Sequence, residues 1–330
     1  MKRALFLLLG AGFLVVVALV LFWCLRPRGP ESTEISVILD FFANPNHVPL
    51  YVALDKGFFG DEGVKVVVQI PADPSDPVKL AAVGTMDVAL TPQINFLIAK
   101  AAGLPLIAIG ALVETSLGGL LSLKENGVEQ LSDLRGRRIG YSLAPLEPIL
   151  WRTMLTSVGV GADEFELVNV GFNTMFSLLA HNVDAIGAFR NFELVQASLL
   201  GREPIFFPEE DYGVPDTYEI LLVVNPQRLQ DRPTVFRRFL RGLVRGIAFT
   251  RSHPEEAFEC FLHAHPDLGD ELNRRAYERT LPLYAQEARH TDKAKWEKLQ
   301  EYLLMNGLIG RVFPLAELYT DVYLDLVEGS

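Results

Sequence analysis

The hydrophobic pattern of the chain changes character near residue 30. Residues 4–23 (ALFLLLGAGFLVVVALVLFW) carry no charge, and about 20 such residues cross the hydrocarbon core of a membrane as a helix. Lys2 and Arg3 precede this run, as they do in signal and anchor segments. No A-x-A-like cleavage site follows, and Trp23 stands before Cys24, so we expect an uncleaved anchor over residues 1–25. Cleavage, or lipidation of Cys24, stays open as an alternative.

Beyond a polar linker at residues 26–34, short apolar runs alternate with helical patterns, which predicts βαβ units and a mostly parallel sheet. A first set has expected strands at 35–42, 64–70, 88–90 and 106–113, and helices at 48–59, 76–84 and 93–102. A second set has expected strands at 120–123, 138–141, 166–170, 185–189, 205–207 and 218–224, and helices at 148–158 and 174–182. Only helical spacing follows residue 225. Two α/β sets with a helical tail predict two lobes that face one cleft.

The charge and the motif content of the chain exclude several classes of function. The chain has 30 Lys and Arg against 41 Asp and Glu, a formal net charge of −11, whereas a nucleic-acid binder needs a basic surface. Two cysteines, Cys24 and Cys260, cannot form a disulfide framework or a cysteine-rich metal site. The sequence contains no phosphate-binding loop, no H-E-x-x-H, no C-x-x-C and no G-x-S-x-G. We therefore expect no catalytic residue, no metal and no cofactor.

Two segments carry residues suited to binding a small polar molecule. The first follows the strand expected at 35–42 and contains Asp40, Phe41, Phe42, Asn46 and His47. Ligands of open α/β sheets lie at the carboxyl ends of strands, which is where this segment falls. Turn and cap formation would account for the asparagine, but it does not account for Asp40, His47 or the two phenylalanines.

The second segment is the junction after the strand expected at 185–189. Phe189 can stack on a flat ring, and Asn191 and Glu193 can hydrogen-bond to it. The alternative is an ordinary strand–helix junction, in which an acid in the first helical turn is favourable anyway. Weaker candidates follow from the strand-end rule alone: Gln93, Ser142, Tyr218 and Glu219.

At this point the sequence resembles a known family: the periplasmic solute-binding proteins that deliver thiamine pyrimidine precursors to ABC importers. The same superfamily includes the fungal hydroxymethylpyrimidine phosphate synthases. The matching stretches are LDFFANPNHVPLYVALDKGFF from Leu39, PADPSDPVKLAAVGTMDVAL from Pro71, DLRGRRIGYS from Asp133, VDAIGAFRNFEL from Val183 and DYGVPDTYEILLVVN from Asp211. They cover nearly all of residues 35–225, whereas the helical tail is less diagnostic.

The resemblance implies a type II periplasmic-binding-protein-like fold: two α/β lobes joined by two crossing strands, with a hinge between them and the ligand in the cleft. We expect residues 35–118 with 225–330 to form lobe 1, and 119–224 to form lobe 2. The segments around Asp40 and Glu193 would then face each other across the cleft. Phe41 stands where the family usually has tryptophan, and Phe189 where it often has tyrosine; both changes keep a stacking face and lose a polar handle.

The implied function is that of a substrate-binding protein, not an enzyme, which captures an aminopyrimidine by hinge closure and delivers it to an inner-membrane ABC permease. We expect a periplasmic monomer held at the inner membrane by the N-terminal helix. One alternative is a same-fold binder of a riboflavin-like heterocycle or a sulfonate, although the acidic pair Asp40 and Glu193 disfavours an anion.

A second alternative is the synthase. The fungal enzymes that the sequence resembles consume an active-site histidine, which His47 matches. They also carry a cysteine-rich iron motif, which has no counterpart here because the body beyond the anchor holds only Cys260. An exported location would in addition separate the protein from cytosolic pyridoxal phosphate.

Overall fold

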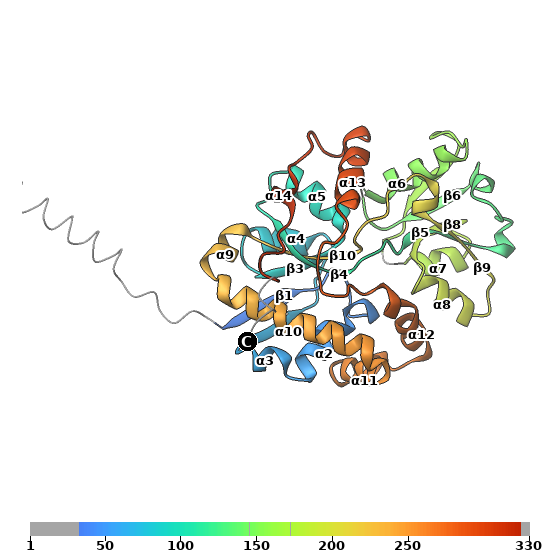
Figure 1. Cartoon of the computed structure of the whole chain (residues 1–330). Coiled ribbons are helices and arrows are strands. Elements are labelled where there is room, and N and C mark those ends of the chain that lie inside the picture. Colours follow the sequence, from blue (N-terminus) through green and yellow to red (C-terminus); the bar gives the residue numbers. More distant parts are fainter. Residues whose placement is uncertain (1–32, 145, 172, 325–330) are drawn as a thin grey trace, which may run out of the picture. The chain divides into compact units, whose positions relative to one another are not determined.

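A computed structural model describes residues 33–144, 146–171 and 173–324, in which two five-stranded sheets form two lobes (Figure 1). The first sheet has the order β2-β1-β3-β10-β4. Its strands are β1 (Glu34–Ile38), β2 (Lys65–Gln69), β3 (Val88–Thr91), β4 (Ile107–Val113) and β10 (Ile220–Val224). β1 runs parallel to β2 and β3, and β10 runs antiparallel to β3 and β4. Every residue of β3 and β10 is buried, as expected for a sheet covered on both faces.

The second sheet repeats this arrangement with the order β7-β6-β8-β5-β9. Its strands are β5 (Gly118–Leu123), β6 (Arg138–Tyr141), β7 (Glu166–Asn169), β8 (Ala185–Phe189) and β9 (Pro204–Pro208). β6 is parallel to β7 and β8, and β5 is antiparallel to β8 and β9. In each sheet the antiparallel strand is the first one formed after the chain has crossed from the other sheet.

Helices cover the sheets and form the tail (Figure 1). Around the first sheet lie α2 (Val48–Asp55), α3 (Phe58–Asp61), α4 (Asp76–Ala82) and α5 (Gln93–Ala101), and around the second α6 (Leu146–Ser157), α7 (Thr174–Leu179) and α8 (Glu193–Leu199). The tail comprises α9 (Pro226–Asp231), α10 (Pro233–Ser252), α11 (Pro254–Ala264), α12 (Glu271–Thr280), α13 (Lys293–Met305) and α14 (Leu315–Leu318). α10 packs on α2 and α3, whereas α12 contacts both the first lobe and α8 of the second.

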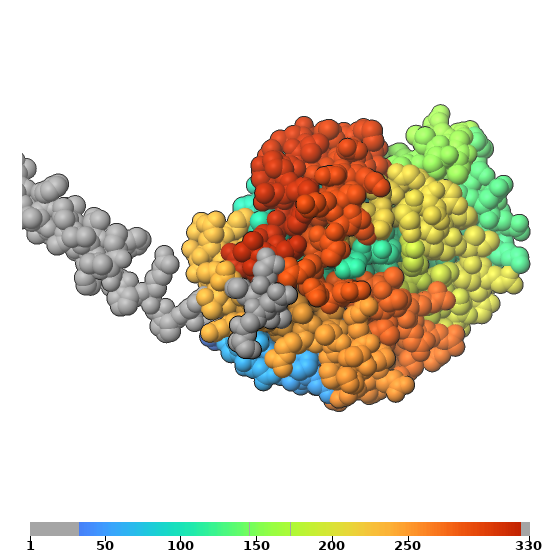
Figure 2. All heavy atoms as spheres, viewed as in Figure 1, coloured from blue at the N-terminus to red at the C-terminus, as the bar shows by residue number. Residues whose placement is uncertain are grey.

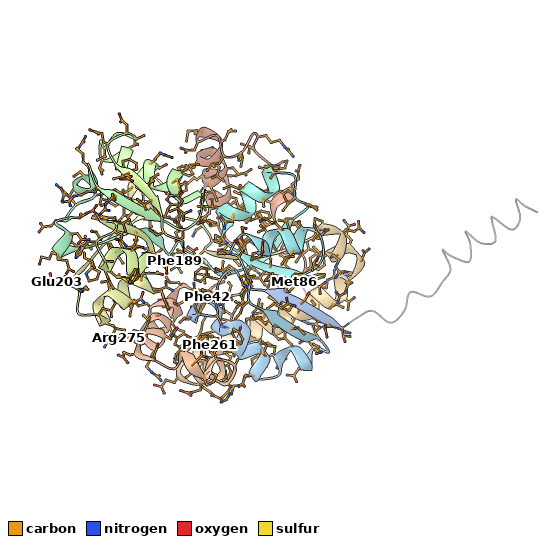
Figure 3. The ribbon with its side chains drawn as sticks, turned by 180° about the vertical axis from the view of Figure 1, so that it is seen from behind. Phe42, Met86, Phe189, Glu203, Phe261 and Arg275 are labelled. Atoms are coloured by element: carbon orange, nitrogen blue, oxygen red, sulfur yellow. The ribbon has the colours of Figure 1, made fainter. Side chains whose placement is uncertain are left out.

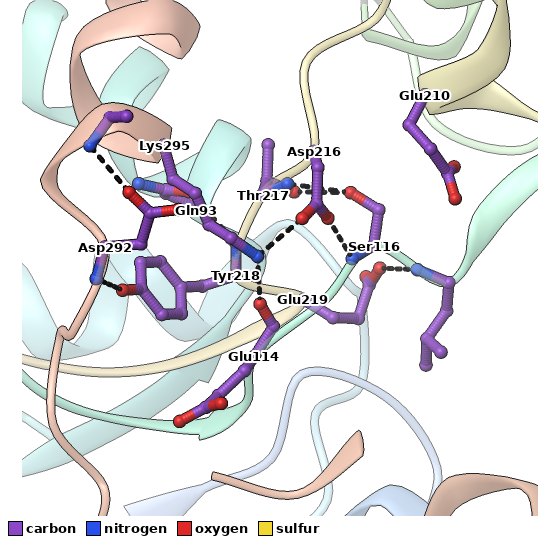
Figure 4. Close-up of polar contacts among 12 residues, drawn as sticks. Gln93, Glu114, Ser116, Glu210, Asp216, Thr217, Tyr218, Glu219, Asp292 and Lys295 are labelled. Atoms are coloured by element: carbon purple, nitrogen blue, oxygen red, sulfur yellow. Dashed lines mark hydrogen bonds and ion pairs between the residues drawn. The ribbon is translucent and has the colours of Figure 1, made fainter. Parts of the chain in front are cut away.

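Side chains fasten the two crossing segments to each other (Figure 4). Asp216 and Glu219 of the returning segment accept hydrogen bonds from the backbone amides of Ser116 and Leu117, at 3.0 and 2.8 Å. The backbone amide of Thr217 donates to the Ser116 hydroxyl at 2.9 Å. Lys295 of α13 pairs with Asp216 at 2.7 Å and donates to the carbonyl oxygen of Glu114, so one ammonium group contacts both crossings. The two crossing segments are thus held together largely by side-chain acceptors on backbone amides.

Several boundaries differ from the sequence prediction for physical reasons. The expected second lobe ran to residue 224, but β10 pairs with β3 and β4, so residues 220–224 belong to the first sheet. The strand expected at 35–42 ends at Ile38, which leaves residues 40–43 in a bend. The helix expected at 48–59 is interrupted at Gly57, whose φ of 71° is left-handed.

The predicted anchor at residues 1–25 and most of the linker at 26–34 lie outside the described residues. Within the ranges that the structure describes, no helix is both long enough and apolar enough to span a membrane.

The contact between α10 and α2 yields a stability prediction at Gly246. A Cβ atom there would lie 2.4 Å from the carbonyl oxygen of Pro49 and 2.9 Å from the Cβ of Ala53, both on α2. Because backbone cannot move aside as a flexible side chain can, we expect Gly246→Ala to destabilise the protein by about 1–3 kcal/mol. Thermal unfolding followed by circular dichroism measures this loss.

Gly60 of α3 supplies the matched control, since a Cβ there meets nothing within 4 Å. Gly60→Ala should be neutral or stabilising by up to about 1 kcal/mol. Equal melting temperatures for the two variants would show that α10 and α2 can separate at little cost.

Candidate functional site

A carboxylate–imidazole pair lies just beyond β1. His47 is fully buried, and its Nδ1 accepts a hydrogen bond from the backbone amide of Asn44 at 3.2 Å. Nε2 must therefore carry the proton, which it donates to Oδ1 of Asp40 at 2.7 Å. The Asp40 side chain keeps 11% exposure, so its carboxylate can also contact a molecule outside. Local sequence creates the pair, because Pro45, Asn46 and His47 form a 3-10 turn (η1) that brings residue 47 back toward residue 40.

Two aromatic rings stand beside this pair. Phe41 and Phe42 are 39% and 55% exposed, and their ring centroids lie 5.0 Å apart in an edge-on arrangement. In the view of Figure 3, Phe42 and Phe189 both lie near the line along which the lobes meet. Figure 2 shows a recess between the red C-terminal helices and the yellow part of the second lobe.

The β8–α8 junction of the second lobe holds a buried carboxylate. Oε2 of Glu193 accepts a hydrogen bond from the backbone amide of Phe189 at 2.8 Å, and the side chain also contacts its own amide. Burial raises the pKa of Glu193, although these two bonds to its ionised form oppose the rise. The neighbouring Arg190 is paired with both carboxylate oxygens of Glu210, at 2.6 and 2.7 Å.

A buried amide forms hydrogen bonds between the two lobes. Nδ2 of Asn191, in the second lobe, donates to Oδ1 of Asn46 and to Oγ1 of Thr280, both at 2.8 Å. These three residues are at most 3% exposed. Asn46 belongs to the turn after β1 and Thr280 ends α12, so the bond network joins three distant parts of the chain. Oδ1 of Asn191 is buried and has no partner among the described residues.

The four weaker candidates differ in how far their polar groups are hydrogen-bonded within the protein. Gln93 is fully buried and accepts the backbone amide of Tyr218 at 3.0 Å. Tyr218 is 1% exposed and belongs to a hydrophobic core cluster, and its hydroxyl accepts a hydrogen bond from the amide of Asp292 at 2.8 Å. Ser142 is exposed, and its hydroxyl donates to the carbonyl oxygen of Gly171. Burial raises the pKa of Glu219 to about 7, to which the nearby charge of Asp40 contributes.

Sequence reasoning missed three groups near this region. Glu147, in the first turn of α6, accepts a hydrogen bond from the amide of Ser142 at 2.6 Å, and burial raises its pKa to about 7. Burial, with the like charges of Glu219 and Glu210, raises the pKa of Glu209 to about 8. Thr280 is the third. Glu147 could have been found from the sequence, because an acid in the first turn of a helix is a recognisable pattern. Glu209 and Thr280 could not, because their contacts are made with segments remote in sequence.

Metal ligation is not indicated in the described part of the chain. There, no group of three or more His, Cys, Asp and Glu side chains is arranged to hold an ion.

A family model described as NMT1/THI5 like matches residues 44–257, more than half of the chain. The chain belongs to the NMT1/THI5-like family. This confirms the resemblance drawn from the sequence. A member from Haemophilus influenzae, named putative thiamine biosynthesis protein, is 38% identical over 291 residues, which cover 88% of this chain and 92% of that protein.

Other relatives of this NMT1/THI5-like protein carry two kinds of name. A formylaminopyrimidine-binding protein of Halalkalibacterium halodurans is 29% identical over 283 residues, covering 83% of this chain and 86% of its own. A 4-amino-5-hydroxymethyl-2-methylpyrimidine phosphate synthase of Legionella pneumophila is 29% identical over 296 residues, covering 89% and 93%. The family thus includes proteins named as binders and proteins named as enzymes.

Solved structures confirm the expected two-lobed periplasmic-binding-protein-like fold. The alkanesulfonate-binding protein of Xanthomonas axonopodis pv. citri, bound to MOPS, has a TM-score of 0.70 to this chain at 14% identity. The match covers 88% of this chain and 99% of that one. At this identity the likeness concerns the fold alone.

The buried carboxyl of Glu209 makes the stability of this family member depend on pH. Because its folded pKa of about 8 lies above the ordinary value of 4.5, the native state holds this proton more tightly than the unfolded chain does. The resulting stabilisation is complete below about pH 4.5 and is lost as the pH rises through about 8. Glu209→Gln removes the titration. From pH 5 to pH 9, we therefore expect the free energy of unfolding of wild type to fall by about 1 kcal/mol or more relative to that of the variant.

Urea unfolding at about pH 5, 7 and 9 measures this difference. Glu129→Gln, at an exposed position, serves as the control and should track wild type at each pH. A difference between Glu209→Gln and wild type that stays constant over the range would show that Glu209 ionises normally.

Proposed function

We propose that the protein is the extracytoplasmic solute-binding component of an ABC importer, and that it captures a thiamine pyrimidine precursor and passes it to a permease. The observation that carries this proposal is the placement of carboxylates at strand ends of both lobes, Asp40 after β1 and Glu193 after β8, with the exposed Phe41 and Phe42 beside Asp40. The family and its formylaminopyrimidine-binding member support the same substrate class. A formylated aminomethylpyrimidine fits this chemistry.

In this proposal each lobe supplies part of the site. Asp40 accepts a hydrogen bond from the exocyclic amine with the oxygen that His47 does not use, and Glu193 offers a second acceptor from the opposite lobe. Phe41, Phe42 and Phe189 provide faces for the ring. Glu219 lies close enough to Asp40 for their charges to interact, so the crossing segment also borders the site. Ligand contacts made in both lobes stabilise the closed state over the open one, which the permease distinguishes.

Asn46, Asn191, Gln93, Ser142 and Tyr218 were expected to contact the ligand, and we propose a supporting role for them instead. Their hydrogen bonds, described above, engage other parts of the protein, so we assign them to closure and support of the site. The free Oδ1 of Asn191 is the exception, because it can still accept a hydrogen bond from a ligand.

A second candidate is a pyrimidine phosphate synthase. The Legionella relative with that name, and the presence of His47, favour it. Against it, both ring nitrogens of His47 are engaged and the side chain is fully buried. Formation of hydroxymethylpyrimidine phosphate on incubation with pyridoxal phosphate and iron would support the synthase and contradict the binding proposal.

The binding proposal predicts a large effect at Asp40. In Asp40→Asn one acceptor becomes an amide donor that faces the ligand amine, so a charge-assisted hydrogen bond is lost. Such a bond contributes about 1.5–3 kcal/mol, and we expect affinity for formylaminopyrimidine to fall roughly 10–150-fold. Calorimetric titration at neutral pH measures the change.

Asp163→Asn is the matched control, because Asp163 is exposed in the turn between α6 and β7. It should bind as wild type does. If the affinity of Asp40→Asn stays within about twofold of that of wild type, Asp40 does not contact the ligand. If wild type does not bind formylaminopyrimidine, the proposed ligand is wrong.

A further inference from the structure

The chain that follows α12 lies along the edge of the first sheet. Residues 283–285 pair with residues 112–114, where β4 ends and the first crossing begins, through two backbone hydrogen bonds of 3.0 Å. Tyr284 forms an antiparallel bridge with Val113 at the centre of this pairing. Arg251 of α10 donates to the carbonyl oxygen of Tyr284 at 2.9 Å. The backbone of Tyr284 is therefore held both by the sheet and by α10.

The side chain of Tyr284 reaches the turn that carries the first half of the candidate site. It is 1% exposed, and its hydroxyl donates to the carbonyl oxygen of Pro45 in η1. Burial raises the pKa of Tyr284 well above its ordinary value, so the hydroxyl keeps its proton and stays a donor. Tyr284 thus ties η1 to the end of β4, from which the chain crosses to the second lobe.

The turn is cross-linked internally, so that it moves as one unit. The side chain of Asn44 accepts from the amide of Asn46 and donates to the carbonyl oxygen of Phe42, both at 2.9 Å. The amide of Asn44 donates to Nδ1 of His47, and Nε2 of His47 in turn contacts Asp40. An external anchor on this unit therefore helps to fix where the Asp40 carboxylate lies.

Asp40 needs such an anchor because the sheet itself does not extend to it. β1 ends at Ile38, and residues 40–43 form a bend. Oδ1 of Asp40 accepts from His47, and the side chain keeps 11% exposure. Hydrogen bonds weaken steeply when their distance or angle departs from the preferred range. A small displacement of the turn would therefore weaken any hydrogen bond that Asp40 accepts from a ligand.

We propose that Tyr284 is a positioning residue of the ligand site, which acts through Pro45 and the turn to hold the carboxylate of Asp40 in place. A tyrosine that only fills the core would also need a partner for its buried hydroxyl. The two roles differ in what the loss of the hydroxyl changes: stability alone, or the site as well. The inference rests on the proposed function for the identity of the ligand, whereas the anchoring of the turn does not depend on it.

The first test compares Tyr284→Phe with Tyr277→Phe, each of which keeps the ring and removes the hydroxyl. Tyr277 of α12 is 4% exposed and donates to the carbonyl oxygen of Pro254 at 2.9 Å, so it is a matched control away from the turn. A loss of stability alone would affect both variants alike. In calorimetric titration with formylaminopyrimidine, we expect the affinity of Tyr284→Phe to fall about tenfold and that of Tyr277→Phe to stay within about twofold of wild type.

The double variant Tyr284→Phe with Asp40→Asn asks whether the effect passes through Asp40. If it does, adding Tyr284→Phe to Asp40→Asn should change the affinity by no more than about twofold, because the two losses are not independent. A tenfold loss in both backgrounds would overturn the inference, and so would a Tyr284→Phe variant that binds as tightly as wild type.

Hydrogen exchange at His47, followed by nuclear magnetic resonance of the histidine-labelled full chain, needs no ligand. The Nε2 proton of His47 should exchange at least about tenfold faster in Tyr284→Phe than in wild type, and at the wild-type rate in Tyr277→Phe. The buried pair of His290 and Asp321, at 2.8 Å, provides a reference proton that neither variant should affect.

The exchange measurement separates this inference from the proposed function. If wild type does not bind formylaminopyrimidine but the His47 proton responds as expected, the proposed ligand is wrong and the positioning role of Tyr284 is supported. If the His47 proton exchanges at the same rate in Tyr284→Phe and wild type, Tyr284 does not position the turn and the inference is wrong.

Discussion

A buried amide, that of Asn191, joins the two lobes beside the candidate site. Its two hydrogen bonds, to Asn46 and Thr280, join the end of β8 to the turn after β1 and to the last residue of α12. All three side chains are buried, so an open form must expose or re-pair several polar groups. The contact also brings two candidate segments together, because Asp40 and Glu193 each lie within a few residues of one end of it.

Charged groups of the crossing segments interact with those of the candidate site. Asp216 and Glu219 fasten the crossing segments through backbone amides, and Glu219 interacts with Asp40 and with Arg190. Glu209 lies against the same crossing: a Cβ on Gly118 would come within 2.7 Å of its carboxylate. In the proposed function, a ligand that brings hydrogen-bond donors into this cluster relieves like-charge repulsion between the lobes. Binding and closure are thereby coupled by charge as well as by contact.

Much of the fold could be predicted from the sequence, since strand and helix periods are local properties. The alternation of short apolar runs with helical patterns up to residue 224 predicted every strand of both sheets to within a few residues. The sheet to which residues 220–224 belong could not be predicted, because the direction of a crossing is set by pairing with β3 and β4 and not by the local pattern. The break at Gly57 was missed because the apolar spacing continues across it.

The candidate residues were predictable as neighbours at strand ends, but their hydrogen-bond partners were less so. Asp40 with His47, and Phe189 with Glu193, are pairs only four to seven residues apart, and each pair is in contact just beyond its strand. Asn46 and Asn191 were expected to bind ligand, but they bond to each other across 145 residues of chain. A single sequence does not reveal such a pairing. The same applies to Glu147, whose partner amides become visible only when the turn after β6 is built.

The central claim is that the cleft selects an uncharged or cationic aminopyrimidine. Mass spectrometry of small molecules released by denaturing the protein after native purification from its own cells tests this claim most directly. The account predicts an amino-substituted pyrimidine without phosphate or sulfonate. Release of a phosphorylated or sulfonated compound in stoichiometric amount would contradict it.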